Sequence, residues 1–327
     1  MDSAARRYER MEYRRCGRSG LKLPAVSLGA WQAIGSYRAT DESRAIIHTA
    51  FDRGITHFDF ANNYGDPPGS SEELFGRILP ELPRDELIIS TKAGYKMWPG
   101  PYGDWGSRKY IVASCDASLK RLGVDYVDIF YHHRYDPDTP LAETMGALET
   151  LVHQGKALYV GLSNYHDPSF TAACELMDAR GWSPVTIHQP RYNLIDRRAA
   201  QSVLPTAAER GVGVICFSPL AQGLLTDRYL AGVPDDSRAA VRGGGLADRL
   251  TPELVQALRE LDALARDRGQ SLAELALAWL LRDERVTSVL IGASRVEHIR
   301  TNVEAPRQTG FADDELARID AICERIL

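Results

Sequence analysis

The chain has 327 residues, of which 44% are hydrophobic and 25% charged, and its 39 Lys+Arg against 44 Asp+Glu give a net charge of −5. This slight acidity argues against a nucleic-acid-binding protein, because phosphate recognition needs a concentrated basic surface. No stretch reaches the ~20 apolar residues of a membrane span, and the amino end does not fit the pattern expected of a secretory signal. Five widely spaced cysteines without a C-x-x-C pair favour reduced thiols. We therefore expect a cytoplasmic globular protein that binds neither nucleic acid nor a membrane.

The amino end contains six arginines interrupted by acidic residues, so we interpret residues 1–12 as a flexible, solvated tail. Residues 13–327 are then expected to form a single domain. Within it, Tyr13 to Leu23 has glycine and serine at its middle, which predicts an amino-terminal β-hairpin.

From Ala25 onward, short apolar runs alternate with segments of helical periodicity, as in consecutive β/α units. Eight runs have strand character: Val26–Gly29, Thr56–Asp59, Leu87–Thr91, Tyr126–Tyr131, Ala157–Leu162, Val185–His188, Val212–Phe217 and Val289–Ile291. They are apolar throughout, which is typical of a parallel sheet buried on both faces. Eight such units predict a closed (β/α)8 TIM barrel of the α/β class, followed by an extra carboxyl-terminal helix over Asp313–Ile326.

Helix boundaries between the strands have local signals. Thr40 precedes an acidic first turn of a helix that Gly54 ends, and Ser70–Glu73 has the pattern of a capping box. A doubly wound sheet is the competing fold. It is disfavoured because no G-x-G-x-x-G lies between a strand and a helix, and Gly243–Gly245 lies in a polar loop.

The chemistry of a TIM barrel sits at the carboxyl ends of its strands. The polar, aromatic and small residues at or just after these ends are Asp59, Tyr64, Lys92, His132, His133, Ser163, Asn164, Gln189, Phe217, Ser218, Gly292, Ala293 and Ser294. Each alone has an ordinary structural explanation, such as a turn cap or a solvated side chain. Barrel closure, however, brings them to one mouth, where Lys, Asp, Tyr and His would perturb each other's pKa values.

A tyrosine ionises near pH ~10, so it donates a proton to an alkoxide effectively only when a cation stabilises the phenolate. Lys92 can be that cation, Asp59 can keep it charged, and a histidine can hold the substrate oxygen. Asn164, Gln189 and Phe217 offer amide and aromatic partners for a hydride-carrying nucleotide, and the start of the last helix suits a phosphate.

Several motifs resemble a known family: Phe58–Gly65, Thr91–Lys92, Asp128–Arg134, Gly161–Asn164 and Ile291–Ser294. They resemble the aldo-keto reductase superfamily, and the resemblance covers nearly the whole chain. Lys92–Gly103 and Thr287–Ser294 are most similar to the bacterial L-glyceraldehyde 3-phosphate reductase and methylglyoxal reductase branch, which is related to potassium-channel β subunits. The resemblance implies NADPH-dependent reduction of small aldehydes, such as glyceraldehyde 3-phosphate or methylglyoxal, by a homo-oligomer, tetrameric or octameric.

The resemblance also implies a catalytic tetrad of Asp59, Tyr64, Lys92 and His133. Tyr64 would be the general acid, Lys92 and Asp59 would lower its pKa, and His133 would orient the carbonyl. His132 is the alternative to His133, which is preferred because the family's histidine immediately precedes an arginine, here Arg134.

By the same resemblance, the cofactor contacts fall into three groups. The nicotinamide would be held by Ser163, Asn164, Gln189 and Phe217. The pyrophosphate would be approached by Ser218, Leu220 and Gly223. The adenosine end would be held by Gly292, Ser294, Arg295, His298 and Asn302. Ser294 and Arg295 offer a hydroxyl and a charged fork for a 2′-phosphate, which favours NADPH over NADH; His298 and Thr301 depart from the family's usual residues. The substrate pocket is expected to be lined by Trp31, Tyr64, Trp98, Tyr102 and His133.

Two other functions stay open. A Schiff-base lyase would use Lys92 as nucleophile, but Asp59 would keep that amine protonated. A regulatory subunit that binds NADPH and a partner protein would resemble the channel β subunits, in which the family has Asn where His133 stands. No metal site is expected, since the strand ends offer one carboxylate and no H-E-x-x-H.

Overall fold

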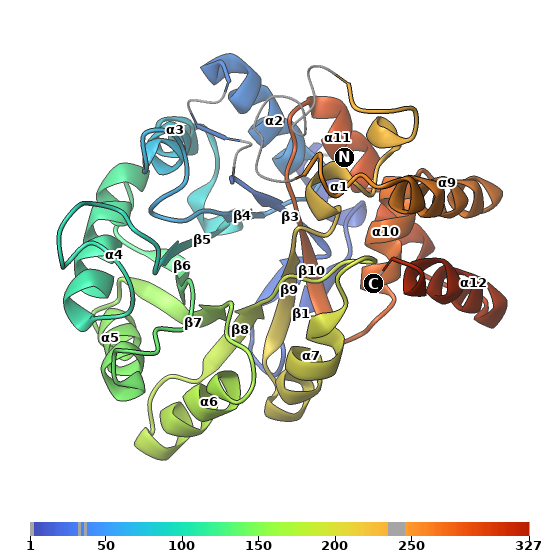
Figure 1. Cartoon of the computed structure of the whole chain (residues 1–327). Coiled ribbons are helices and arrows are strands. Elements are labelled where there is room, and N and C mark those ends of the chain that lie inside the picture. Colours follow the sequence, from blue (N-terminus) through green and yellow to red (C-terminus); the bar gives the residue numbers. More distant parts are fainter. Residues whose placement is uncertain (1–2, 32–33, 36–37, 235–245, 327) are drawn as a thin grey trace.

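The computed structural model describes residues 3–31, 34–35, 38–234 and 246–326, and they form a closed parallel barrel surrounded by helices (Figure 1). Around the barrel the strand order is β10-β3-β4-β5-β6-β7-β8-β9. The strands are β3 Val26–Gly29, β4 His57–Asp59, β5 Ile88–Ala93, β6 Val127–His132, β7 Ala157–Ser163, β8 Val185–Gln189, β9 Gly213–Phe217 and β10 Val286–Ile291. The predicted TIM barrel is therefore confirmed.

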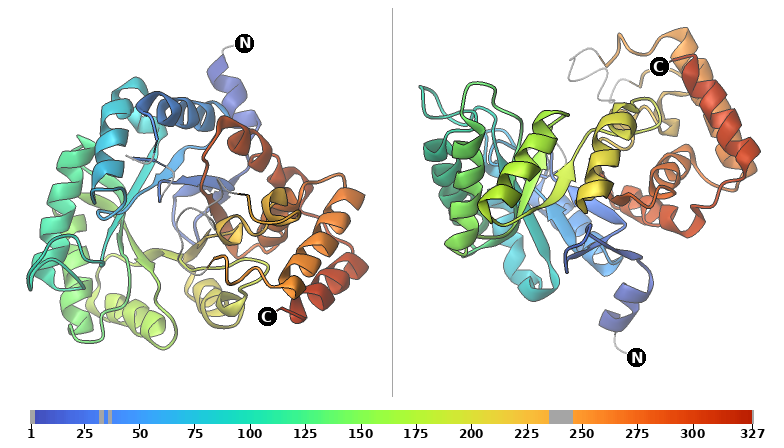
Figure 2. Two further views of the ribbon diagram at one scale, coloured as in Figure 1. Left: turned by 45° about the horizontal axis from the view of Figure 1, so that its top comes forward. Right: turned by 90° about the horizontal axis from the view of Figure 1, so that it is seen from below.

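Helices cover the outside of this barrel, and α9 and α12 lie together beyond it (Figure 2). The α-helices after the first strand are α2 Thr40–Asp52, α3 Ser70–Ile78, α4 Arg108–Leu122, α5 Leu141–His153, α6 Ser169–Arg180, α7 Arg198–Arg210, α9 Pro252–Asp267, α10 Leu272–Leu281, α11 Val296–Asn302 and α12 Asp313–Glu324. The short 3₁₀ helices are η1 Leu79–Glu81, η2 Arg84–Glu86, η3 Ala221–Gly223, η4 Asp227–Tyr229 and η5 Ala305–Gln308. None of the helices in these described ranges is both long and apolar enough to cross a membrane.

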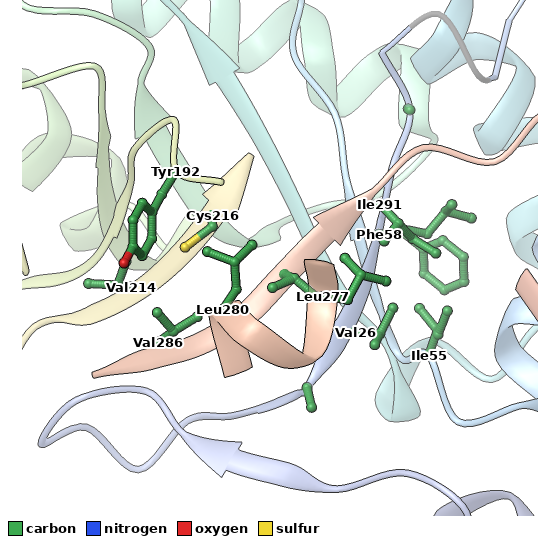
Figure 3. Packing of buried hydrophobic residues seen from close by; sticks show 14 of the residues in the cluster. Val26, Ile55, Phe58, Tyr192, Val214, Cys216, Leu277, Leu280, Val286 and Ile291 are labelled. Atoms are coloured by element: carbon green, nitrogen blue, oxygen red, sulfur yellow. The ribbon is translucent and has the colours of Figure 1, made fainter. Parts of the chain in front are cut away.

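Two apolar layers hold the barrel together. Between strands and helices, Phe58 of β4 packs against Phe75 of α3 at 5.2 Å between ring centroids, within a large buried layer (Figure 3). Inside the barrel, a second cluster is made of Cys16, Leu21, Leu23, Ile129, Tyr131, Ile187, Ile215 and Leu290. Because successive residues of a strand face opposite ways, the neighbours of Phe58 in β4 point to the interior.

The predicted amino-terminal hairpin is present as β1 Tyr13–Arg15 paired antiparallel with β2 Lys22–Pro24. Its Leu23 belongs to the interior cluster, and Cys16 Sγ contacts the Thr186 carbonyl at 3.5 Å, near the start of β8. The hairpin therefore closes the end of the barrel where the strands begin, and the site must lie at the opposite end.

Two expectations differ from the structure, and a third concerns residues outside the described ranges. The capping box over Ser70–Glu73 is wrong: left-handed Gly69 is the N-cap of α3 without a side-chain bond, so the helix begins at Ser70, which is its first residue and not its cap. Residues 1–12, expected as a solvated tail, contain helix α1 (Ser3–Glu9). The Arg7 guanidinium of this helix lies 3.7 Å from the ring centroid of Phe51 on α2, so helix α1 packs against α2. The glycine run 243–245 lies outside the described residues.

Candidate active site

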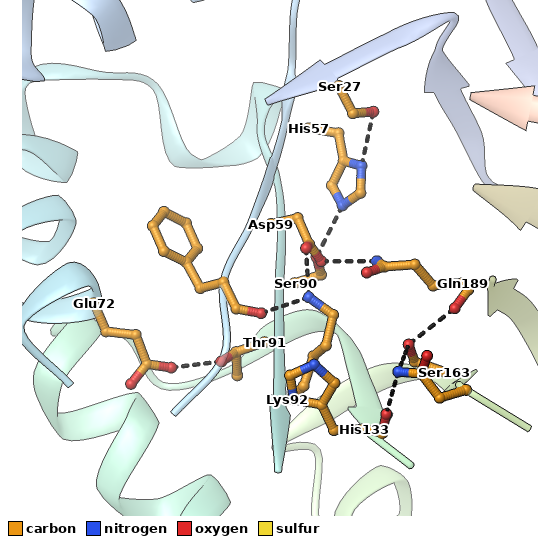
Figure 4. A network of polar contacts seen from close by, with 12 residues as sticks. Ser27, His57, Asp59, Glu72, Ser90, Thr91, Lys92, His133, Ser163 and Gln189 are labelled. Carbon is orange, nitrogen blue, oxygen red and sulfur yellow. Dashed lines mark hydrogen bonds and ion pairs between the residues drawn. The ribbon is translucent and has the colours of Figure 1, made fainter. Parts of the chain in front are cut away.

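A buried ion pair forms the base of the site at the carboxyl end of the barrel. Asp59 ends β4 opposite Ser90 of β5, and Lys92 lies two residues further on the same inner face (Figure 4). The Lys92 ammonium donates to Asp59 Oδ2 and, at 2.8 Å, to the Phe60 carbonyl; both charged side chains are fully buried. Burial lowers the pKa of Lys92, and the Asp59 carboxylate opposes that change. Asp59 therefore favours the charged state of this lysine.

Tyr64 and His133 lie beside this pair. The Lys92 Nζ is 5.2 Å from the ring centroid of Tyr64, and the Tyr64 and His133 rings are 5.9 Å apart in an edge arrangement. Burial holds the pKa of His133 well below its usual 6.5, and the positive charges of Lys92, His132 and Arg134 lower it further. His133 is thus a neutral imidazole at pH 7, with one N–H to donate. The structure brings the four tetrad residues together.

The two adjacent histidines face opposite sides of the barrel wall. His132, in β6, bonds through Nδ1 to the Tyr165 hydroxyl at 2.6 Å, and its Cε1 lies near Gly106, on the helix side. His133 follows the strand and contacts Tyr64. The alternation of the strand therefore assigns His133 to the mouth and His132 to the surrounding layer.

The expected lowering of the Tyr64 pKa is not what the structure has. Burial raises the pKa of Tyr64 well above its usual 10, and the charges of Asp59 and Tyr95 add to the increase. The physical reason is chiefly burial of the Tyr64 hydroxyl, which disfavours the charged phenolate. Tyr64 is consequently a protonated phenol at neutral pH.

The residues expected to hold the nicotinamide are linked to the tetrad. Ser163 Oγ donates to the Gln189 carbonyl at 2.9 Å, and Asn164 Nδ2 donates to the His133 carbonyl at 2.9 Å. Gln189 Nε2 reaches Asp59 Oδ1 across the barrel at 3.3 Å. Asn164 has φ 53°, a left-handed conformation that costs energy outside glycine and is common at functional sites.

In the loop after β9, where the pyrophosphate contacts are expected, several residues also have a left-handed backbone conformation. Its positive φ values are 53° at Ser218, 48° at Ala221, 64° at Gln222 and 97° at Gly223. Phe217 before it is half-buried, and Leu220 packs against the core. Consecutive strained residues in a loop at the barrel mouth are typical of a segment that is shaped to meet a ligand.

The segment after β10, where the adenosine end of the cofactor is expected, has arginines around His298. Ser294 donates its backbone N–H to His298 Nδ1 at 3.3 Å, and Arg38 Nη1 donates to the Ser294 carbonyl at 2.8 Å. The pKa of His298 is lowered, first by burial and then by the positive charges of Arg295 and Arg228. Nearby Gly292 is exposed and Asn302 is buried.

Arg38 and Arg228 were missed by the sequence reasoning. They lie in the segments that follow β3 and β9, the two strands that flank β10 in the closed barrel. The signal was available, because closure makes the loops after the first, seventh and eighth strands neighbours. Barrel closure therefore brings the arginines of these three loops near one another.

The residues expected to line the substrate pocket differ in exposure and in their contacts. Trp31 is 44% exposed, and Trp98 packs on Tyr110 at 5.2 Å between centroids. Tyr102 is 58% exposed, and its ring lies beside the Lys109 ammonium. Tyr95, which sequence reasoning missed, also contacts the tetrad: its ring stands perpendicular to that of His133, with 4.7 Å between centroids.

Comparison with known proteins identifies the family of this chain. The sequence profile of the Aldo/keto reductase family matches residues 25–324. The chain belongs to the aldo/keto reductase family. It is 56% identical over 324 residues to a protein of Escherichia coli K12 named L-glyceraldehyde 3-phosphate reductase, covering 96% of this chain and 93% of that relative. It is 37% identical over 303 residues to a probable voltage-gated potassium channel subunit beta of Arabidopsis thaliana, covering 90% and 91%.

Family membership makes this aldo/keto reductase an oxidoreductase acting on aldehydes, with a nicotinamide nucleotide as the cofactor class. Among the described residues, no group of three or more His, Cys, Asp or Glu side chains is arranged to hold a metal ion.

Proposed function

We propose that this aldo/keto reductase uses NADPH to reduce small aldehydes to alcohols, with Tyr64 as the proton donor. The observation that carries the proposal is the contact of a protonated phenol, Tyr64, and a neutral imidazole, His133, beside the buried Lys92–Asp59 pair. A donor, an orienting group and a cation thus meet at the carboxyl end of the barrel, where TIM-barrel chemistry takes place.

The residues divide the work as follows. NADPH, when bound, supplies the hydride that adds to the carbonyl carbon. His133 donates its N–H to the carbonyl oxygen and so orients it, and Tyr64 gives its hydroxyl proton to that oxygen as the alcohol forms. The Lys92 ammonium is the nearby cation for the phenolate left behind, and Asp59 keeps it charged. Solvent then returns a proton to Tyr64.

The residues present fit a phosphorylated dinucleotide. Ser163, Asn164 and Gln189 would hold the carboxamide, and Phe217 would lie on the ring. The arginines around His298, namely Arg38, Arg228 and Arg295, would attract the 2′-phosphate that distinguishes NADPH from NADH.

Short polar aldehydes are the proposed substrates. The E. coli relative is named for L-glyceraldehyde 3-phosphate, and its identity extends over almost the whole chain. Methylglyoxal is the second candidate, of the same class. Tyr64, His133, Trp31, Trp98 and Tyr102 would form the walls that these aldehydes contact.

The test is the loss of NADPH absorbance with purified protein and either L-glyceraldehyde 3-phosphate or methylglyoxal, with NADH in parallel. We expect turnover with both aldehydes, faster with NADPH, and none with the Tyr64→Phe variant. Turnover that persists in that variant would reject Tyr64 as the donor. Borohydride trapping of an aldehyde on Lys92 would instead support the lyase.

A regulatory role is the second candidate, because the chain is 37% identical to a probable channel β subunit. His133 stands where that group has Asn, which favours turnover. Tight NADPH binding without turnover of any aldehyde would favour the regulatory role.

A further inference from the structure

Five polar side chains form a continuous row through the inside of the barrel, which we call the Ser288–Asp59 chain. It consists of Ser288 of β10, Ser27 of β3, His57 and Asp59 of β4, and Ser90 of β5, and all five are fully buried. The other side of the interior is filled by the apolar cluster, as is usual in a TIM barrel. Buried polar groups are costly unless they are paired, so this row calls for a physical explanation.

Each neighbouring pair in the chain is within hydrogen-bond distance. Ser288 Oγ lies 2.7 Å from Ser27 Oγ, which lies 3.0 Å from His57 Nδ1. His57 Nε2 lies 2.9 Å from Ser90 Oγ, and Ser90 Oγ donates to Asp59 Oδ1 at 2.5 Å (Figure 4). The chain therefore ends on the carboxylate that binds Lys92.

The direction of every bond follows from the carboxylate, which can only accept. Ser90 gives its one proton to Asp59, so it offers His57 only a lone pair. His57 must then carry its proton on Nε2 and accept at Nδ1 from Ser27. Ser27 in turn accepts from Ser288 at 2.7 Å, which is closer than the alternative acceptor of the Ser288 hydroxyl, the Ala25 carbonyl at 3.4 Å. The low pKa of His57, about 4 because of burial, agrees with a neutral ring at pH 7.

We propose that Ser90, His57 and Ser27 are positioning residues of the reductase site, which act by aligning their donors toward Asp59. Aligned donors polarise one another in a low-dielectric interior, so the Ser288–Asp59 chain holds the carboxylate of Asp59 in one orientation. Asp59 in turn keeps Lys92 charged beside Tyr64. This inference rests on the proposed function. The donor–acceptor direction of the hydrogen bonds in the Ser288–Asp59 chain is independent of that function.

A pH dependence follows from the groups around the ion pair. The titratable groups facing it are His57, Tyr64, Tyr131, His133 and, from α3, Glu72. Asp59 opposes the lowering of the Lys92 pKa by burial. When the Asp59 carboxylate loses its fixed orientation, it opposes this lowering of the Lys92 pKa less strongly. Lys92 then loses its proton at a lower pH. The alkaline limb of kcat/KM should then move to lower pH.

The donor–acceptor direction of the hydrogen bonds in the Ser288–Asp59 chain can be measured without cofactor or turnover. In ¹⁵N-labelled protein, assigned with a His57→Gln variant, the long-range ¹⁵N–¹H spectrum should show the His57 ring as the neutral Nε2–H tautomer at pH 7. An Nδ1–H tautomer, or a doubly protonated ring, would overturn the inference. This readout stands even if no aldehyde is reduced.

The positioning role is tested by Ser90→Ala, Ser27→Ala and the matched control Ser43→Ala, in which the lost hydroxyl is buried and has no partner among the described residues. We expect Ser90→Ala to lower kcat about tenfold, as for loss of a hydrogen bond to a charged group. Ser27→Ala should lower it by a smaller factor. Both should move the alkaline limb to lower pH and leave NADPH affinity unchanged.

The decisive variant is Ser27→Ala, since Ser27 reaches Asp59 only through His57 and Ser90. If its kcat and its alkaline limb match those of Ser43→Ala, the positioning role is rejected. Ser90→Thr, which keeps the hydroxyl, should restore the wild-type limb. Absence of turnover in the wild-type protein would instead reject the proposed function, and the tautomer would still decide the direction of the chain.

Discussion

Replacing Lys92 by Met tests the energetics of the buried ion pair. Met keeps the length and packing of the side chain but removes the charge, which leaves the Asp59 carboxylate buried without a cation. Removing one partner of a buried pair costs about 3–5 kcal/mol. Asp59 retains donors in Ser90 and Gln189, so we expect the lower end, about 3 kcal/mol at pH 7.

The sign of the pH dependence is determined by the same carboxylate. Without Lys92, Asp59 takes up a proton in the folded state at higher pH than in the unfolded chain, so the penalty is relieved as the pH falls. Integrating the linkage for one proton, the difference from wild type should fall to about half by pH 5. Urea unfolding at both pH values measures it, with Lys92→Met/Asp59→Asn as the control that removes both charges and recovers most of the stability. An equal difference at pH 7 and pH 5 would refute this reasoning.

Three further outcomes are expected. Arg295→Ala should raise the Kd for NADPH more than for NADH in fluorescence titrations, since the guanidinium attracts the 2′-phosphate; equal losses would remove it from that role. His133→Asn should lower kcat by about 10²-fold or more while His132→Asn leaves kcat nearly unchanged, and the reverse order in steady-state assays would exchange the two histidines. Gly161→Ala should cost about 1–3 kcal/mol by overpacking, because its Cβ would lie 2.4 Å from the Tyr131 ring; Gly20→Ala, with open space around it, is the control, and equal unfolding midpoints would contradict the packing argument.

The strands could be predicted from sequence because a parallel sheet buried on both faces leaves uninterrupted apolar runs. Even so, β10 begins at Val286, three residues before the expected Val289. Thr287 and Ser288 interrupt the apolar pattern there, and the pairing with β9 shifts register at the same place. Ser288 was hidden from a hydrophobicity argument because its partner, Ser27, comes from a strand far away in the chain.

The tetrad could be located because strand ends converge in any barrel, but its electrostatics could not. Sequence gives the types of these residues and not their burial. Lys92 and Asp59 are fully buried, and burial of Tyr64 itself raises its pKa instead of lowering it. Glu72 shows the same limit: nothing local in the sequence indicates that its side chain is fully buried and that its carboxylate accepts from Arg121 on α4.

The most direct test of the central claim is a single-turnover experiment on Tyr64→Phe, with NADPH bound and aldehyde added, next to a fluorescence titration of NADPH. Phe keeps the ring against His133 and removes only the hydroxyl. The account predicts an unchanged Kd for NADPH and a loss of the hydride-transfer step by at least about 10²-fold, the contribution of a positioned proton donor. Hydride transfer at the wild-type rate would contradict it.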